Sequence, residues 1–312
     1  MANRGANRGE PWSTLVVKLI RAHIRLGIHP SCWKVARGVT IPKPGKENYG
    51  LDKSYRVISL LNYLGKMVEK VAAMMVSVHY EATGRFHPGQ HRCRVRRSAV
   101  DTVRVTIAQT QEAWRWNRIT GALLMDVAAA FSSVARGCLL RTMRAIGLDE
   151  NLIDRTDSFM QNRRVIMSVD GQDDSPREVT TGLPQGSPIS PVLFAIYIAD
   201  IHAAVEDQVE DSRGISFDDD VTWLVEGRDI GEVVRKLERC VAASLEWAES
   251  NAVRFETSMT EAILFSRKRA HRKCQAPIWV GEQTVRFAPE ATWWLGIWLN
   301  SELRLCKDVR NT

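Results

Sequence analysis

The sequence predicts an α+β protein in which helices pack on an antiparallel sheet. Helical and strand-like segments follow one another irregularly, which disfavours the regular strand–helix alternation of a doubly wound parallel sheet. Two strands predicted at residues 214–217 and 221–225 are close enough in sequence to form a hairpin, with Asp218, Asp219 and Asp220 at its turn. These two observations carry the prediction of the fold class.

The composition is that of an ordinary globular protein. The chain has 312 residues, of which 45% are hydrophobic and 25% charged, enough for a substantial core in one or two domains. Its net charge of +7 suits an anionic partner but does not by itself indicate nucleic-acid binding. Six cysteines without metal-ligand spacing argue against a disulfide framework or a zinc site. With no long apolar run and no secretory start, we expect a soluble, intracellular protein that does not associate with membranes.

The N-terminal part is predicted to form helices with two extended segments between them. Apolar residues at helical spacing predict a first helix that ends near Gly27 and Pro30. Extended segments follow at residues 33–41 and 55–61, separated by a basic turn. Helices are then predicted at about residues 65–82, 98–116 and 135–146, and a strand at residues 121–127.

The C-terminal part is predicted to contain further strands and two helices. A strand pair is expected around residues 164–169 and 178–181, followed by a strongly apolar helix after Pro188. After the hairpin come a long helix at about residues 230–250 and alternating segments at residues 252–256 and 261–265.

Two apolar, strand-like runs end in carboxylates, at Asp126 and at residues 218–220. Either group alone is most often a polar turn. Both strands would lie centrally in one sheet, however, where uncompensated charge is costly. Mg²⁺ takes oxygen ligands from one or two carboxylates together with substrate phosphates, and a pair of such ions serves phosphoryl transfer. The two runs together therefore indicate a polymerase-type metal site.

A loop at residues 182–191 makes this interpretation more specific. It caps the next helix, with Ser187 as the predicted N-cap and Pro188 at the first helical position. Its two glycines allow the backbone to approach a base or sugar closely. Gln185 offers both a donor and an acceptor beside a templating base pair.

The chain resembles the reverse transcriptases of non-LTR (LINE-like) retrotransposons, and the sequences of its motifs are most similar to those of fungal elements of that kind. The resemblance covers roughly residues 33–299, and several ordered motifs carry it. The matching motifs are residues 41–46, 54–61, 126–131, 182–191, 217–221 and 294–298.

The resemblance implies a right-hand polymerase of fingers and palm, with an antiparallel palm sheet packed on helices. It predicts an N-terminal tail and helix at residues 1–30 and fingers at residues 31–120. The palm would span residues 121–270 with an inserted fingers segment at about residues 150–181. Residues 271–312 would form the end of the palm and the primer-grip region, and we expect no thumb in this chain.

The resemblance also implies roles for individual residues. It assigns catalysis to Asp126, Asp219 and Asp220, and metal coordination to Asp126, Asp219 and the carbonyl of Val127. It assigns nucleotide binding to Lys43, Arg56, the amides of Ala129 and Ala130, Phe131 as the sugar gate, Gln185 and Gly186.

Nucleic-acid contact is expected from two further regions. The basic segment at residues 90–97 is either a solvated surface or a contact for template or primer phosphates. The resemblance places residues 294–298 near the primer. The nucleic-acid-binding candidates are Arg92, Arg94, Arg96, Arg97, Trp294 and Gly296. The implied partners are an RNA template, a DNA primer and dNTPs, with Mg²⁺ or alternatively Mn²⁺ as cofactor, and the implied location is the nucleus.

The sequence departs from the family pattern at three positions, of which Val57 and Asp218 lie inside these motifs. Asp218 stands where the family has a small or aliphatic residue, and adds a like charge beside the metal site. Met259 stands where the family has a lysine that assists pyrophosphate release, and loss of a general acid typically costs about 10²–10⁴-fold in rate. Val57 replaces a proline after Arg56.

Three functions are compatible with these features. The first is an RNA-directed DNA polymerase, favoured by the intact Asp126, Asp219 and Asp220 and by the loop at residues 182–191. The second is a catalytically decayed relic that retains RNA or hybrid binding, favoured by Asp218 and Met259. A third, an intron-maturase-like protein, would need a basic extension after the palm, which the sequence lacks.

Overall fold

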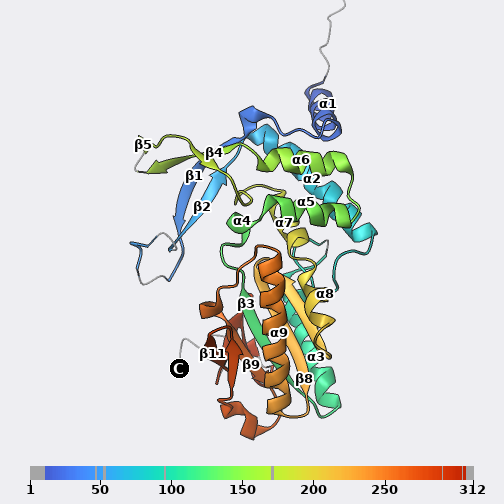
Figure 1. Ribbon diagram of the computed structural model, residues 1–312, viewed down its shortest axis with the longest axis vertical. Helices are drawn as coiled ribbons and strands as arrows, with labels where there is room; N and C mark the ends of the chain where they lie inside the picture. Colours follow the sequence, from blue (N-terminus) through green and yellow to red (C-terminus); the bar gives the residue numbers. More distant parts are fainter. Residues whose placement is uncertain are drawn as a thin grey trace, which may run out of the picture. The chain divides into compact units, whose positions relative to one another are not determined.

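The computed structural model of the chain describes residues 11–45, 48–51, 54–94, 96–169, 172–289, 291–303 and 305–306 (Figure 1). The chain folds into two compact units. Unit 1 comprises Met1–His79 and Leu140–Ser190, and unit 2 comprises Tyr80–Leu139 and Pro191–Thr312. Residues 80–120, which the resemblance places in the fingers, belong to unit 2. Residues 1–10 of the predicted N-terminal tail lie outside the described residues.

Unit 1 combines helices with a sheet that is mostly antiparallel. Its strands run in the order β2-β1-β4-β5, with β6 also paired to β4, and only the β1–β4 pairing is parallel. The strands are β1 (Val35–Pro42), β2 (Tyr55–Leu60), β4 (Arg163–Val169), β5 (Gln172–Asp173) and β6 (Arg177–Val179). The helices are α1 (Trp12–Arg25), α2 (Tyr63–Ala82) and α6 (Glu150–Met160), with the short 3₁₀ turn η1 (Ser31–Trp33); α2 continues into unit 2.

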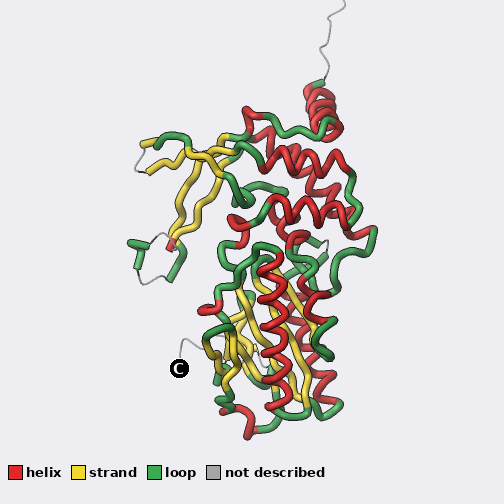
Figure 2. The backbone as a smooth tube through the Cα atoms, in the orientation of Figure 1, coloured by secondary structure: helices red, strands yellow, loops and turns green. Residues whose placement is uncertain are grey.

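Unit 2 is built on an antiparallel sheet in the order β7-β8-β3-β9 (Figure 2). Its strands are β3 (Ile119–Asp126), β7 (Ser212–Phe217), β8 (Asp220–Gly227) and β9 (Glu261–Phe265). The main helices are α3 (Ala99–Arg115) and α9 (Ile230–Ser250), with α4 (Ala130–Ser133) and α8 (Ile201–Glu206) shorter. Two more helices, α5 (Arg136–Ala145) and α7 (Ser190–Tyr197), run from one unit into the other.

Helices cover both faces of the unit 2 sheet. On one face a Cβ at Gly121 would lie 2.4 Å from a methyl of Val233 on α9, so only glycine lets α9 approach β3 this closely. On the other face Ala122, Leu224 and Phe265 share a core with Val103 of α3 and with Trp294. The remaining strands are short: β10 (Pro277–Val280), β11 (Gln283–Arg286), β12 (Ala291–Trp294), β13 (Ile297–Asn300) and β14 (Leu305–Cys306).

Most predicted elements form within a few residues of their expected limits. The helix predicted at residues 98–116 is α3, which begins after Ser98 with a capping box closed by Asp101. Residues 252–256 are an exception, because Phe255 makes only an isolated bridge with Val127 and no strand forms there. Among the described residues, no helix combines the length and apolar composition that a membrane span requires.

Candidate active site

The carboxylates at the two predicted strand ends lie side by side on the unit 2 sheet. Strand β3 ends at Asp126 and β8 begins at Asp220, and the antiparallel register makes these two residues direct partners. Direct partners place their side chains on the same face of a sheet. Phe217, the last residue of β7, is the partner of Asp220 on its other side. The structure therefore brings together carboxylates that are far apart in sequence.

Asp218 and Asp219 form the turn of the β7–β8 hairpin. Asp218 has φ 54°, a left-handed conformation that aspartate tolerates better than most residues. Its carboxylate forms an ion pair with Arg92 at 2.9 Å, and the Arg92 guanidinium lies 5.4 Å from the centre of the Phe217 ring. The charge that Asp218 adds to the turn is thus partly compensated by a cation that sequence reasoning had assigned only to nucleic acid.

The surroundings of Asp220 fit a divalent cation. Burial first, and then the charges of Asp219, Asp126 and Asp218 in that order, together raise the pKa of Asp220 to about 7. Burial also raises the pKa of Asp218, which Arg92 partly opposes. Several like charges held at one partly buried strand end are unfavourable without a counter-charge, and a divalent cation supplies one.

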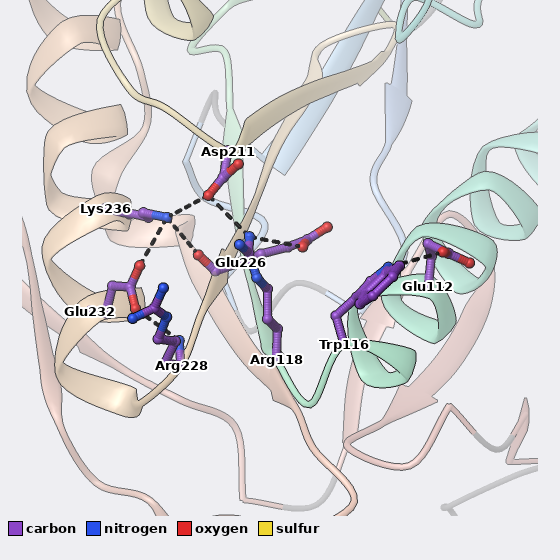
Figure 3. Close-up of polar contacts among 8 residues, drawn as sticks. All are labelled: Glu112, Trp116, Arg118, Asp211, Glu226, Arg228, Glu232 and Lys236. Carbon is purple, nitrogen blue, oxygen red and sulfur yellow. Dashed lines mark hydrogen bonds and ion pairs between the residues drawn. The ribbon is translucent and has the colours of Figure 1, made fainter.

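The opposite end of the same sheet shows how this protein treats structural carboxylates. There Arg118 pairs with Asp211 at 3.1 Å and with Glu226 at 3.6 Å (Figure 3). Lys236 pairs with Asp211 at 3.2 Å and with Glu232 at 3.1 Å. Lys236 and Arg118 hold the pKa of Asp211 below its ordinary value. At this end the carboxylates are satisfied by side chains, whereas the pKa of Asp220 is raised, which is the pattern of a cation site.

The backbone of Val127 faces the aspartate turn. Its N–H donates to the carbonyl of Asp219 at 3.1 Å. Because N–H and C=O of one extended residue point to the same side of a strand, the Val127 carbonyl also faces the turn. Hydrogen bonds from Glu256 N–H to the Asp126 carbonyl at 2.8 Å and from Ala128 N–H to the Arg254 carbonyl at 2.8 Å fix this strand end. Asp126, Asp219 and the Val127 carbonyl would thus hold the cation.

The residues after Val127 turn sharply into α4. Ala129 has φ 51°, and α4 begins at Ala130, so the first amides of this helix have no acceptor within it. The ring of the half-buried Phe131 lies 5.2 Å from that of Phe194, which fixes its orientation. The predicted nucleotide-binding residues of unit 2 therefore follow directly after the carboxylate Asp126.

Lys43 and Arg56 come together on the β1–β2 hairpin of unit 1. Ile41 pairs with Arg56, and the hairpin continues with a hydrogen bond from Lys43 N–H to the Ser54 carbonyl at 2.8 Å. This register places the side chains of Lys43 and Arg56 diagonally on one face. Arg56 is exposed and Lys43 half-buried, so both can meet an anionic ligand.

Gln185 and Gly186 form a tight turn against β2 in unit 1. Ser59 N–H donates to the Gln185 carbonyl at 2.7 Å. Gly186 has φ +119°, and a Cβ there would lie 2.6 Å from the Ser59 carbonyl oxygen. Both conformation and space therefore require glycine at this position.

The basic segment divides into paired and exposed cations. The Arg94 guanidinium makes two hydrogen bonds to Glu81, both of 3.0 Å, and its side chain is only 13% exposed. Arg94 therefore stabilises unit 2, and its assignment to nucleic acid is corrected here. Arg96 and Arg97 are exposed. Val95 lies outside the described residues.

Trp294 also differs from its predicted role. Its side chain is 5% exposed and belongs to the core, so it cannot stack on nucleic acid. Gly296 has φ +84° in the turn between β12 and β13. The neighbouring Trp293 is 50% exposed and its ring lies 5.3 Å from that of Trp298. On this strand the exposed aromatic side chain is therefore Trp293, not the predicted Trp294.

Met259 ends a short 3₁₀ turn, η3 (Thr257–Met259), and is 56% exposed. A methionine side chain cannot supply the amino group that the resemblance predicts at this position.

A further group of ligand-type side chains, which sequence reasoning missed, consists of His87, His202 and Glu206. The two imidazole rings are stacked 4.4 Å apart at 9°. Parallel stacked rings cannot both direct a lone pair at one ion, because a ligating imidazole holds its metal near the ring plane.

The stacked pair instead predicts acid sensitivity. His202 is fully buried, its Nε2 lies 3.0 Å from the Ser216 hydroxyl, and burial together with His87 and His91 lowers its pKa to about 3. The folded pKa lies below the unfolded value near 6.5, so the unfolded chain takes up a proton at His202 before the folded protein does. The free energy of unfolding therefore decreases as the pH falls from about 6.5 towards 3. We expect the difference in unfolding free energy between wild type and His202→Gln to narrow by roughly 1 kcal/mol per pH unit over this range. Urea unfolding of both proteins at pH 7, 6 and 5 measures this difference in unfolding free energy. A difference that does not change with pH would contradict the lowered pKa of His202.

Comparison with known proteins agrees with this geometry. Residues 41–299 match the family described as reverse transcriptase (RNA-dependent DNA polymerase). The RNA-directed DNA polymerase from mobile element jockey of Drosophila funebris is 28% identical over 236 residues, which cover 75% of this chain and 26% of that protein. The probable RNA-directed DNA polymerase from transposon X-element of Drosophila melanogaster is 25% identical over 295 residues, covering 94% of this chain and 32% of the relative.

Solved structures show the same fold. Telomerase from Candida tropicalis, in complex with a TWJ fragment of telomeric RNA, superposes with a TM-score of 0.60 at 13% identity, over 96% of this chain and 49% of that one. The α+β architecture is therefore the fingers-and-palm fold. The chain spans only 26% and 32% of the two curated relatives named above. With the family match extending over residues 41–299, the chain belongs to the reverse transcriptase family.

Proposed function

We propose that this chain is the polymerase core of a retrotransposon reverse transcriptase, which extends a DNA primer on an RNA template by adding dNTPs. The observation that carries the proposal is the direct pairing of Asp126 with Asp220 beside the Asp218–Asp219 turn, where the pKa of Asp220 is raised to about 7. Unit 1 would supply the fingers and unit 2 the palm.

The cofactor in this proposal is Mg²⁺, with Mn²⁺ as an alternative. Oxygen ligands from carboxylates and one carbonyl suit these hard cations better than zinc or copper. Asp126, Asp219 and the Val127 carbonyl would coordinate, with Asp220 as the second aspartate of the hairpin. When bound, the cations would neutralise charge on the triphosphate and favour attack by the primer hydroxyl.

The other residues would bind and orient the nucleotide. Lys43 and Arg56 share one face of their hairpin and would grip the triphosphate, while the first amides of α4 would donate to it. Phe131 would lie under the sugar and exclude a 2′-hydroxyl. Gln185 and Gly186 would contact the nascent base pair. Catalysis by this arrangement rests on positioning and on charge neutralisation rather than on covalent chemistry.

Nucleic acid would be held by exposed cations, chiefly Arg96 and Arg97, and by Arg92 when it is not paired with Asp218. Contacts to phosphates carry no sequence information, which suits an enzyme that copies arbitrary RNA. The fungal likeness of the motifs and a nuclear site of action are finer proposals that rest on the resemblance alone. The named relatives come from Drosophila, and placement of the chain in a tree of complete elements tests the fungal origin.

The direct test is primer extension on an RNA template in Mg²⁺ or Mn²⁺, using the purified chain. We expect incorporation of dNTPs with strong discrimination against ribonucleotides. Absence of incorporation in both metals, by a folded protein that still binds an RNA–DNA hybrid, would contradict polymerase activity and favour the relic.

The exposed Met259 is the observation that favours the relic, since it can neither donate a proton nor bind a phosphate. We expect Met259→Lys to raise the rate of incorporation about 10²-fold or more, within the range typical of general acids. For Asp218 the left-handed φ makes a β-branched replacement such as valine unsuitable, and Asp218→Asn removes the charge while tolerating that conformation. Primer extension by Met259→Lys alone measures the first gain, and the Met259→Lys, Asp218→Asn double variant measures what the removal of the extra charge adds. Met259→Gln is the matched control, and an equal gain with glutamine would contradict the general-acid explanation.

A further inference from the structure

A buried carboxylate on α2 contacts the loop that carries Gln185 and Gly186. Glu69 is 1% exposed, and it accepts a short hydrogen bond from the hydroxyl of Ser187, which is itself buried. Ser187 directly follows Gly186, and all of these residues belong to unit 1. The proposed nucleotide-binding turn is therefore attached to the core of unit 1 through a charged hydrogen bond.

The rest of the loop is attached through its backbone. Arg163 donates to the Gly182 carbonyl at 2.6 Å and to the Thr181 carbonyl at 2.8 Å. The Ser190 hydroxyl donates to the Pro184 carbonyl at 2.9 Å. These bonds hold the loop on both sides of Gly186, and Glu69 adds a side-chain acceptor for Ser187, the residue that follows it.

A second buried charge interacts electrostatically with Glu69. Arg155 of α6 is 1% exposed, and within the described part of the chain its guanidinium nitrogens have no hydrogen-bond partner. Burial lowers the pKa of Arg155 to about 10, an effect that Glu69 opposes. Burial raises the pKa of Glu69, an effect that Ser187 and Arg155 oppose. Each charge thus offsets part of the cost of burying the other.

Two opposite charges buried in this way are a poor device for stability alone, as even a paired arrangement shows. Replacing a buried ion pair with apolar residues of similar volume is often neutral or stabilising. A carboxylate does provide what a methionine cannot, namely a strong and directional acceptor for one hydroxyl. The arrangement therefore suits positioning of the loop better than stabilisation of the core.

We infer that Glu69 is a positioning residue that holds Ser187 and so fixes the Gln185–Gly186 turn for contact with the nascent base pair. The contact of the turn with that base pair rests on the proposed polymerase function. The positioning itself is a property of unit 1 and can be measured without catalysis.

The first measurement is amide hydrogen exchange at Ser59 and Ser187, whose N–H groups bond to the carbonyls of Gln185 and Pro184. Ser187→Ala and the double variant Glu69→Met, Arg155→Met are expected to speed exchange at both amides at least about 10-fold, while Glu69→Gln, which keeps an acceptor, has a smaller effect. Thr156→Val is the matched control, because it removes a buried hydroxyl that bonds only to Leu152 within α6. Unchanged exchange in the folded Ser187→Ala and double variants would overturn the inference.

The second measurement separates positioning from the proposed function. In primer extension, a displaced turn is expected to lower kcat/KM for dNTP by about 10²-fold, chiefly through KM, and to raise misincorporation. Ser187→Ala added to the Glu69→Met, Arg155→Met variant should cost less than about 2-fold more, because that background has already lost the hydrogen bond through which Ser187 acts. If wild type incorporates nothing, the polymerase proposal fails while exchange still decides the positioning. If wild type is active and the variants keep its kcat/KM and selectivity, the inference fails although the function stands.

Discussion

Replacing Asp126 or Asp219 with alanine is expected to reduce dNTP incorporation by at least about 10³-fold. These carboxylates would hold the cations against the triphosphate. Catalysis of phosphoryl transfer depends almost entirely on positioning and charge neutralisation, so the loss of the cations removes most of it. Asp126 ends β3 and Asp219 lies in the adjoining hairpin turn, so neither substitution removes an apolar core side chain. The loss should therefore appear in activity and not in folding.

Primer extension at saturating Mg²⁺, for each variant beside wild type, gives the magnitude. Asp207→Ala is the matched control, since Asp207 is an exposed aspartate after α8 in the same unit. A second readout needs no turnover: Mg²⁺ should raise the Tm of wild type and of Asp207→Ala, and should do so much less for the two site variants. Incorporation that survives in Asp126→Ala or Asp219→Ala would refute the metal assignment.

The carboxylate site could be predicted because its information is local in sequence. An apolar strand that ends in Asp126 and a hairpin turn of aspartates are visible without knowledge of the fold, and the β3–β8 register then pairs Asp126 with Asp220. The same holds for α3, whose capping residues Ser98 and Asp101 lie within one turn.

What could not be predicted depends on contacts between segments distant in sequence. Glu69 and Ser187 meet across 118 positions, and nothing in the helical pattern around Glu69 distinguishes a buried carboxylate from a solvated one. Arg92 reads as a cation for phosphate until the fold places Asp218 beside it at 2.9 Å. Trp294 was placed beside nucleic acid because a motif carries it, yet the alternation of its strand turns Trp293 outwards and Trp294 into the core. Sequence patterns indicate residue types, while burial and pairing decide what those residues do.

Replacing Gly186 with alanine is expected to lower kcat/KM for dNTP by about 10²-fold, the effect typical of a displacement of about 1 Å at a reacting centre. Two independent costs force the displacement. The φ of +119° is strained for any residue with a Cβ, and that Cβ would lie 2.6 Å from the Ser59 carbonyl oxygen, which is backbone and cannot rotate away. The turn must therefore leave β2, and the hydrogen bond from Ser59 to Gln185 is the first contact to be lost.

Gly147→Ala separates the two costs. Gly147 also has a positive φ, of +74°, and belongs to unit 1, but a Cβ there meets nothing within 4 Å. This control should lose about 1 kcal/mol of stability from backbone strain and keep its activity. Steady-state kinetics and thermal unfolding of both variants decide the matter. If Gly186→Ala behaves like Gly147→Ala, with lower stability and unchanged kcat/KM, then close packing of the turn on β2 is not what positions the nucleotide. If only Gly186→Ala loses activity, the close packing of Gly186 on the Ser59 carbonyl is what positions the nucleotide. The hydrogen bond from Ser187 to Glu69 then helps to keep the turn in this position.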